Sequence, residues 1–179
     1  MLKLTSTEPH RIVTETLIIP VCQDKYIHHS PVIRTLVRQA LGIATFQGDK
    51  KEELTFHQPA DVQAKRVLFV GLGPHAELTP EHFRQAAGKG VRLAMHAAKG
   101  DAVLVLPDGD LGDTLAREDL MAAMAEGAVL SNHCPNHYKS EHKIQALKTI
   151  RLHTDATMAR KSRAALKRID AICRGTLQA

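Results

Sequence analysis

Short apolar runs, each bounded by polar or turn-forming residues, predict the strands of this chain. The clearest covers residues 65–71, KRVLFVG, which are apolar on both faces as in a central parallel strand. Residues 16–22, TLIIPVC, are rich in β-branched side chains and predict a second buried strand. The same pattern predicts strands at residues 53–58, 102–108 and 147–153, with a brief one near residues 2–5.

Apolar residues at helical spacing occupy the stretches between these strands. Ser30 at the N-cap position, Pro31 at the first helical position and Gly42 as the stop predict a helix over residues 31–41. Thr79 and Pro80 begin another, which runs to about residue 99. Further helices are predicted at residues 116–132 and 157–174. The apolar side of the last helix is expected to comprise Met158, Ala165, Leu166, Ile169 and Ile172. Strands that alternate with helices predict an α/β domain with three layers, α/β/α, around a mixed, mostly parallel sheet.

Composition narrows the class of protein. The residues are 44% hydrophobic but only 3% aromatic, so the core must be built from Val, Leu, Ile and Ala. No stretch approaches the roughly 20 apolar residues of a membrane span, and the first residues lack the apolar segment of a signal peptide. The three cysteines are widely spaced and form no disulfide framework. We therefore expect a soluble, cytoplasmic protein with no membrane partner.

Positive charge is concentrated in the C-terminal quarter of the chain. Residues 139–179 carry 10 Lys and Arg against 3 Asp and Glu, whereas the other residues are slightly acidic. The helix predicted there bears a row of basic residues that could contact nucleic acid, through phosphates because aromatics for base stacking are few. The favoured interpretation is a solvated helix face. The basic residues are Arg160, Lys161, Arg163, Lys167 and Arg168.

The sequence GLGPHA after the strand at residues 65–71 loosely fits a dinucleotide-binding turn through Gly71, Gly73 and Ala76. In such a turn the helix begins within the glycine motif, so that its free N–H groups reach the pyrophosphate. Here the predicted cap, Thr79, comes six residues after Gly73. We therefore interpret the glycines as structural, and no cofactor site is predicted.

Other clusters of candidate ligands also lack the spacing of a known site. His133, Cys134, His137 and His142 fit neither a zinc finger nor a helical metal motif, and His28 with His29 indicates a loop. The Asp residues at 101, 108, 110 and 113 are interpreted as one surface turn region. No arrangement indicates a nucleophile with its base, or several carboxylates at strand ends. We therefore predict no catalytic and no metal-binding residue.

Several stretches together resemble one known family. Four stretches are similar to the N-terminal domain of the leucyl aminopeptidases, or cytosol aminopeptidases. They are TLIIPVCQD, AKRVLFVGLGPHAELTPEHFRQAAGKGVRLA, MAAMAEGAVLSNHCPNHYKSEHK and LKTIRLH. The resemblance covers nearly the whole chain. Its more specific positions are Glu126, Gly127, Tyr138, Lys139 and Ser140.

The resemblance implies a fold and a function. That family's N-terminal domain is macro-domain-like and precedes a catalytic domain that holds two divalent metals, zinc or manganese, in a cytoplasmic homo-hexamer. We thus expect residues 1–155 to form the macro-like domain and residues 156–179 a helix leading toward the catalytic domain. None of the catalytic domain's metal-binding motifs is in this sequence. The chain is expected to be a non-catalytic structural and assembly domain; the alternative is a nucleic-acid or ADP-ribose-like nucleotide binding module.

Overall fold

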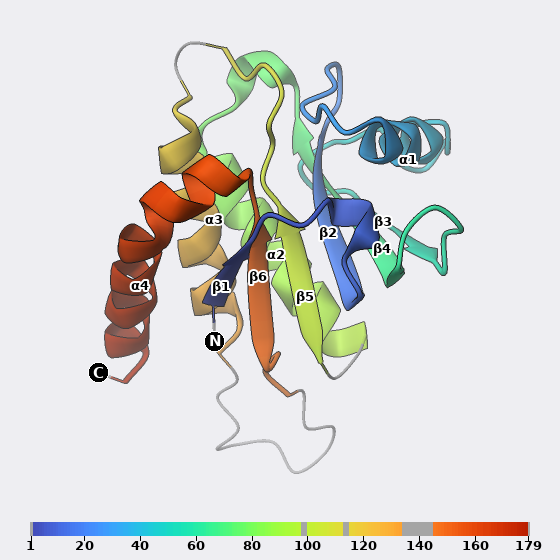
Figure 1. The fold of residues 1–179 in the computed structure, drawn as a ribbon. Coiled ribbons are helices and arrows are strands. Elements are labelled where there is room, and N and C mark those ends of the chain that lie inside the picture. Colours follow the sequence, from blue (N-terminus) through green and yellow to red (C-terminus); the bar gives the residue numbers. More distant parts are fainter. Residues whose placement is uncertain (1, 98–99, 113–114, 134–144, 179) are drawn as a thin grey trace.

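The computed structural model describes residues 2–97, 100–112, 115–133 and 145–178. A six-stranded sheet in the order β1-β6-β5-β2-β4-β3 forms the middle layer, and helices cover both of its faces (Figure 1). The strands are β1 (Leu2–Thr5), β2 (Thr14–Cys22), β3 (Glu53–His57), β4 (Ala64–Gly73), β5 (Asp101–Val105) and β6 (Thr149–His153). The helices are α1 (Pro31–Leu41), α2 (Pro80–Ala97), α3 (Arg117–Ser131) and α4 (Ala156–Gln178), with short 3-10 turns η1 (Pro9–Arg11) and η2 (His75–Glu77).

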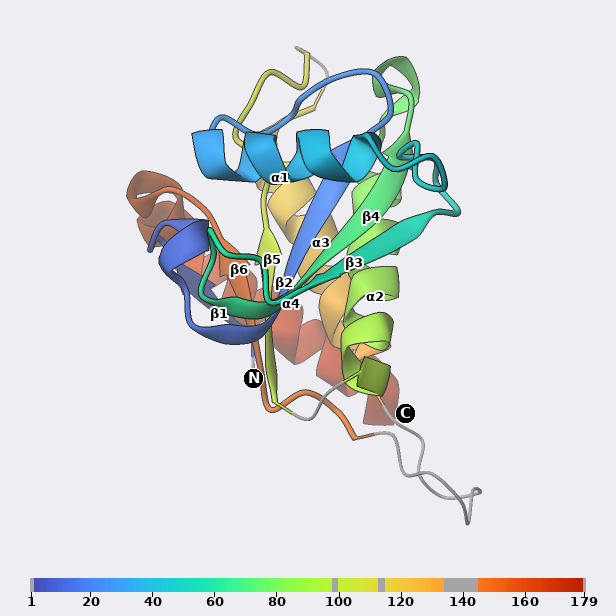
Figure 2. The same cartoon turned by 90° about the vertical axis from the view of Figure 1, so that its right-hand side faces the viewer.

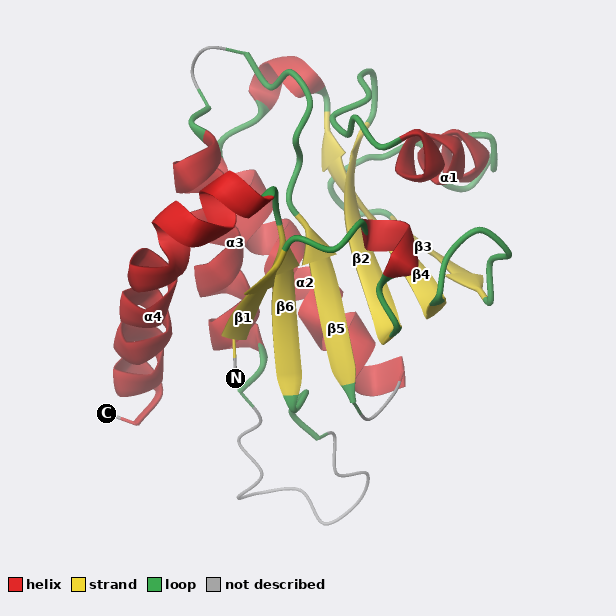
Figure 3. Ribbon diagram, viewed as in Figure 1, coloured by secondary structure: helices red, strands yellow, loops and turns green. Residues whose placement is uncertain are grey.

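All strand pairs are parallel except that of β3 with β4, so the predicted mixed, mostly parallel sheet is confirmed (Figure 3). One detail of the prediction is wrong. β4 is not in the centre of the sheet but next to its edge, where β3 pairs with it antiparallel. β4 is nevertheless buried on both faces, because α2 packs on one side and an aromatic cluster of Phe46, Phe56 and Phe69 lies on the other.

The sheet separates two apolar layers, and successive side chains of β2 belong alternately to one layer and the other. Leu17 and Ile19 belong to the cluster that includes the buried face of α1, whereas Ile18 belongs to the cluster with α2, α3 and α4. Figure 2 shows α1 on one side of the sheet and α2 on the other. Aliphatic side chains supply most of both clusters, as the low aromatic content predicted. Burial of this apolar surface is the main favourable term in folding.

Helix boundaries agree with the sequence prediction to within a few residues, but the caps differ. Ser30 stands at the N-cap of α1 without a capping hydrogen bond from its side chain. Thr79 precedes α2 and donates its N–H to Nδ1 of His82, at 3.1 Å. No helix of the described residues is long and apolar enough to cross a membrane.

The buried face of α4 was only partly predicted. Met158, Leu166 and, in part, Ile169 pack inward as expected, but Ala165 is exposed and Ile172 is 57% exposed. The contact stripe instead passes through Ser162 and Cys173, both buried. α4 packs against α3 and β1, and the smaller side chains of Ser162 and Cys173 fit into this contact. A prediction based on the spacing of aliphatic residues alone does not include them.

Candidate functional site

The Gly-Leu-Gly turn is closed by the chain itself. The N–H of Gly71 donates to the carbonyl of Glu52 at 3.1 Å, and that of Gly73 donates to the carbonyl of Gly48 at 2.9 Å. A Cβ on Gly71 would lie 1.9 Å from the carbonyl oxygen of Asp49, and Gly73 has φ +83°. Both N–H groups are therefore used within the chain. The space at Gly71 and the positive φ of Gly73 give each glycine a structural reason, as the sequence interpretation expects.

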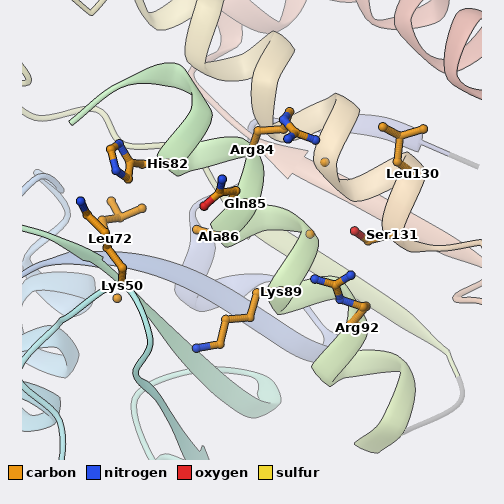
Figure 4. A pocket seen from close by; sticks show the side chains of 13 residues that line it. Lys50, Leu72, His82, Arg84, Gln85, Ala86, Lys89, Arg92, Leu130 and Ser131 are labelled. Atoms are coloured by element: carbon orange, nitrogen blue, oxygen red, sulfur yellow. The ribbon is translucent and has the colours of Figure 1, made fainter. Parts of the chain in front are cut away.

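A groove of about 450 Å³ lies beside this turn, between α2, α3 and the loop that carries Lys50 (Figure 4). Its cationic side chains are largely paired. Lys50 meets Glu77 at 2.9 Å, Arg84 meets Glu81 at 2.6 Å, and Lys89 pairs with Glu53. Hydrogen bonds from Arg84 and then Gln85 hold the pKa of the Glu81 carboxyl at about 2. Three of the four Lys and Arg side chains that line the groove are thus paired with carboxylates, and Arg92 is the fourth.

The α2–α3 contact explains the glycine in the Glu126–Gly127 pair. A Cβ on Gly127 would lie 2.0 Å from the backbone oxygen of Arg84 on α2. The two helices therefore cross so closely that only glycine fits at this position. The other residues that carried the family resemblance, Tyr138, Lys139 and Ser140, lie outside the described residues.

The five basic residues of α4 are all exposed, as predicted: Arg160, Lys161, Arg163, Lys167 and Arg168. The Nε of Arg160 donates to the carbonyl of Ala156 at 3.3 Å, a bond within the helix. Nothing in this geometry tests contact with nucleic acid, which remains a prediction.

The candidate metal ligands are not brought together where they can be described. His133 is exposed after α3, and Cys134, His137 and His142 lie outside the described residues. Within residues 2–97, 100–112, 115–133 and 145–178, no group of three or more His, Cys, Asp or Glu is arranged to hold a metal. Cys22 is buried, and burial raises the pKa of its thiol to about 12, so it is no nucleophile at neutral pH.

The aspartates do not form one turn region, contrary to the prediction. Asp101, at the start of β5, pairs with Arg151 and accepts hydrogen bonds from the Thr14 hydroxyl and the Glu15 N–H, both at 3.1 Å. It ties β2, β5 and β6 together near the start of β5. Asp110 lies beyond the other end of β5 and pairs with Lys25 at 2.8 Å, which lowers the pKa of its carboxyl. Asp113 lies outside the described residues.

Asp108 belongs to a crevice that sequence reasoning missed. This space of about 510 Å³ lies where β1, β5 and β6 end, lined among others by His28, Asp108, Arg117 and His153. The carboxyl ends of parallel strands are the usual ligand site of open α/β sheets. The signal was present in Asp108 and His153, which stand at the ends of two predicted strands, but the loop between residues 22 and 30 gave no sign that His28 is buried.

Comparison with known proteins decides the family. The sequence profile of the cytosol aminopeptidase family, N-terminal domain, matches residues 32–142, more than half of the chain. The chain belongs to this family. It corresponds to the family's N-terminal domain, and the matched region includes the Gly-Leu-Gly turn and the α2–α3 crossing.

Curated relatives of this cytosol aminopeptidase domain are longer proteins. A probable cytosol aminopeptidase of Acidobacterium capsulatum is 30% identical over 148 residues, which are 77% of this chain and 29% of the relative. One of Koribacter versatilis is 35% identical over 112 residues, 56% of this chain and 22% of the relative. The chain thus spans less than a third of the length of these relatives.

Solved structures agree on the fold. A mutant of tomato leucine aminopeptidase superposes with a TM-score of 0.75 over 98% of this chain and 36% of its own, at 17% identity. The bottromycin maturation enzyme BotP, in complex with Mn, gives a TM-score of 0.58 at 25% identity, over 86% of this chain and 30% of its own. The α/β arrangement of this cytosol aminopeptidase domain is therefore that of a leucine aminopeptidase segment.

Proposed function

We propose that this domain is the non-catalytic structural and assembly part of a cytoplasmic, metal-dependent leucyl aminopeptidase, which removes N-terminal amino acids from peptides. The observation that carries the proposal is the match of residues 32–142 to the family's N-terminal domain. The chemistry would belong to a catalytic domain of the same polypeptide, with two divalent metals, zinc or manganese. The macro-like domain would comprise residues 1–155, and residues 156–179 would form the helix toward that catalytic domain.

The partners in this proposal are the catalytic domain and neighbouring subunits of a homo-hexamer. The groove between α3 and α4 supports a role in contacts, because it exposes Ile172 among Ile169, Cys173 and Thr176. Burying the exposed Ile172 side chain against a partner would remove apolar surface from water, which is favourable.

Assembly is tested in the Acidobacterium capsulatum relative. Deleting its N-terminal domain is expected to reduce the number of subunits in the assembly, which sedimentation gives as the ratio of assembly mass to subunit mass. Replacing that domain by this chain is expected to restore the number. The reason is that an assembly domain contributes contacts between subunits that the catalytic domain alone does not make. A deletion variant that keeps the same number of subunits and the same peptidase activity would contradict the assembly role.

A second candidate function is nucleic-acid binding, which the exposed basic row on α4 favours. Binding through phosphates should be independent of sequence and fall steeply between ~50 and ~200 mM salt, because each neutralised phosphate releases counterions. Gel shifts at both salt concentrations measure this, and a variant with Arg163, Lys167 and Arg168 changed to Glu should lose it. No shift at the lower concentration would remove this candidate.

A further inference from the structure

The crevice at the carboxyl ends of β1, β5 and β6 collects features that the assembly role does not use. Three helices begin at its rim: Ser30 and Pro31 lead into α1, Arg117 starts α3, and Asp155 precedes α4 (Figure 1). Its floor is aliphatic, formed by Ile33, Val105 and Leu106. A volume of about 510 Å³ is that of a small-molecule site.

His28 presents a buried polar atom without a partner. The side chain is only 3% exposed, and its Nε2 lies 2.8 Å from the carbonyl oxygen of Pro20. Nε2 must carry the hydrogen to donate to that carbonyl, so in the neutral ring Nδ1 is an acceptor. Burial lowers the pKa of the ring, which favours the neutral form. Nδ1 finds no hydrogen-bond donor in the described part of the chain, so a donor from a ligand would satisfy it.

Carboxylates give the crevice a negative pole. Asp108 uses Oδ1 to accept the His29 N–H at 2.8 Å, while Glu8 is exposed at the rim. Both carboxylates act electrostatically on His153, as do Arg117 and Asp155, so these charged groups all lie around that ring. Asp155 is already engaged, since it pairs with Arg117 at 2.9 Å and accepts the Met158 N–H at the start of α4. The open acceptors suit a group with several N–H donors, such as an ammonium.

A positive pole lies in the same crevice. The first turn of α1 has no capping bond from the Ser30 side chain, and a helix N-terminus attracts carboxylates through its free N–H groups. The Nε of Arg117 is a further donor that finds no partner among the described residues. A ligand with a second or third negative charge, such as a diphosphate, would meet Glu8, Asp108 and Asp155 as well.

We propose that this crevice binds a free α-amino acid with an aliphatic side chain. The ammonium would face Asp108, Glu8 and Nδ1 of His28, and the carboxylate would face the start of α1 and Arg117. The aliphatic side chain would lie on the floor of Ile33, Val105 and Leu106. The site stands on its own residues; if the proposed function is also correct, the ligand belongs to the product class of the parent enzyme, and the domain would sense product.

The test is a titration of the isotope-labelled 179-residue chain with L-leucine, monitored through the NMR chemical shifts of backbone amides and histidine rings. Saturable shifts are expected at His28, Asp108 and His153. N-acetyl-L-leucine, which lacks the ammonium, should not bind, and L-leucinamide, which lacks the carboxylate, should bind about tenfold more weakly, since a charge-assisted contact contributes on the order of 1.4 kcal/mol.

Variants locate the site. Asp108→Asn keeps an acceptor for the His29 N–H but loses the charge, and Glu8→Gln changes only an exposed rim residue; each should weaken L-leucine binding about tenfold. Arg92→Gln, in the groove of Figure 4, is the matched control and should bind as the parent chain does. Any of three results would overturn the proposal: the folded chain does not bind L-leucine, it binds N-acetyl-L-leucine equally well, or it binds ADP-ribose in place of L-leucine. None of these outcomes depends on peptidase activity.

Discussion

Gly127→Ala is expected to destabilise the domain by about 3 kcal/mol or more, at the upper end of what overpacking costs. The added Cβ would lie 2.0 Å from the Arg84 carbonyl oxygen, which is backbone and cannot rotate away. α2 and α3 would have to separate along a contact that is among the most extensive in the fold. Urea unfolding followed by circular dichroism measures the change in the free energy of unfolding.

Gly175→Ala is the matched control for this substitution. Gly175 is also in a helix, α4, but nothing lies within 4 Å of a Cβ built there. This change should leave stability equal or raise it by up to about 1 kcal/mol, the difference in helix propensity. If the two alanine variants unfold at the same urea concentration, the close crossing of α2 and α3 is wrong.

Gly71→Ala is expected to be comparably severe, also about 3 kcal/mol or more, because the Cβ would be 1.9 Å from the Asp49 carbonyl oxygen. The loop that covers the end of β4 could then no longer hydrogen-bond to it. Gly73→Ala should cost less, roughly 1–3 kcal/mol, from the strain of φ +83° in a residue with a Cβ. Its nearest obstacle is the Lys50 side chain, which can move.

The order of these two effects separates the structural from the nucleotide interpretation of the turn. Stability should fall more for Gly71→Ala than for Gly73→Ala in the same urea series. Calorimetric titration of the parent chain with NAD, ATP or ADP-ribose should give no saturable heat attributable to this turn. Micromolar binding that the Gly73→Ala variant loses would show that the N–H groups are available to phosphates after all.

The sequence predicted the elements well because each has a local signature. The apolar run of β4, the Pro31 start of α1 and the alternation of strands with helices all depend on near neighbours in the chain. The order of strands in the sheet does not depend on near neighbours in the chain. β4 was therefore predicted to be central, although β3 is the edge strand and β4 lies next to it. The face of α4 was misjudged for a similar reason: Ser162 is buried by its fit against other elements, which its polarity does not reveal.

The crevice shows the same limit for sites. His28, Asp108 and His153 are separated by 45 residues or more along the chain, and only the parallel arrangement of β5 and β6 brings the last two to one edge. Asp101 looked like part of the same turn as Asp108, yet a five-residue strand places them at opposite ends of β5. Distance along the sequence thus hid the proximity of His28, Asp108 and His153. It also suggested a proximity of Asp101 and Asp108 that the fold does not have.

Hydrolysis of leucine amides by the purified 179-residue chain, with Mn²⁺ or Zn²⁺ supplied, is the measurement that decides whether this domain is catalytic. If this is the non-catalytic domain of a cytosol aminopeptidase, product release should not exceed that of a mock preparation at either metal, while the full-length Acidobacterium capsulatum relative assayed alongside should be active. The same folded chain releasing product in proportion to its concentration, and only with metal present, would contradict the account.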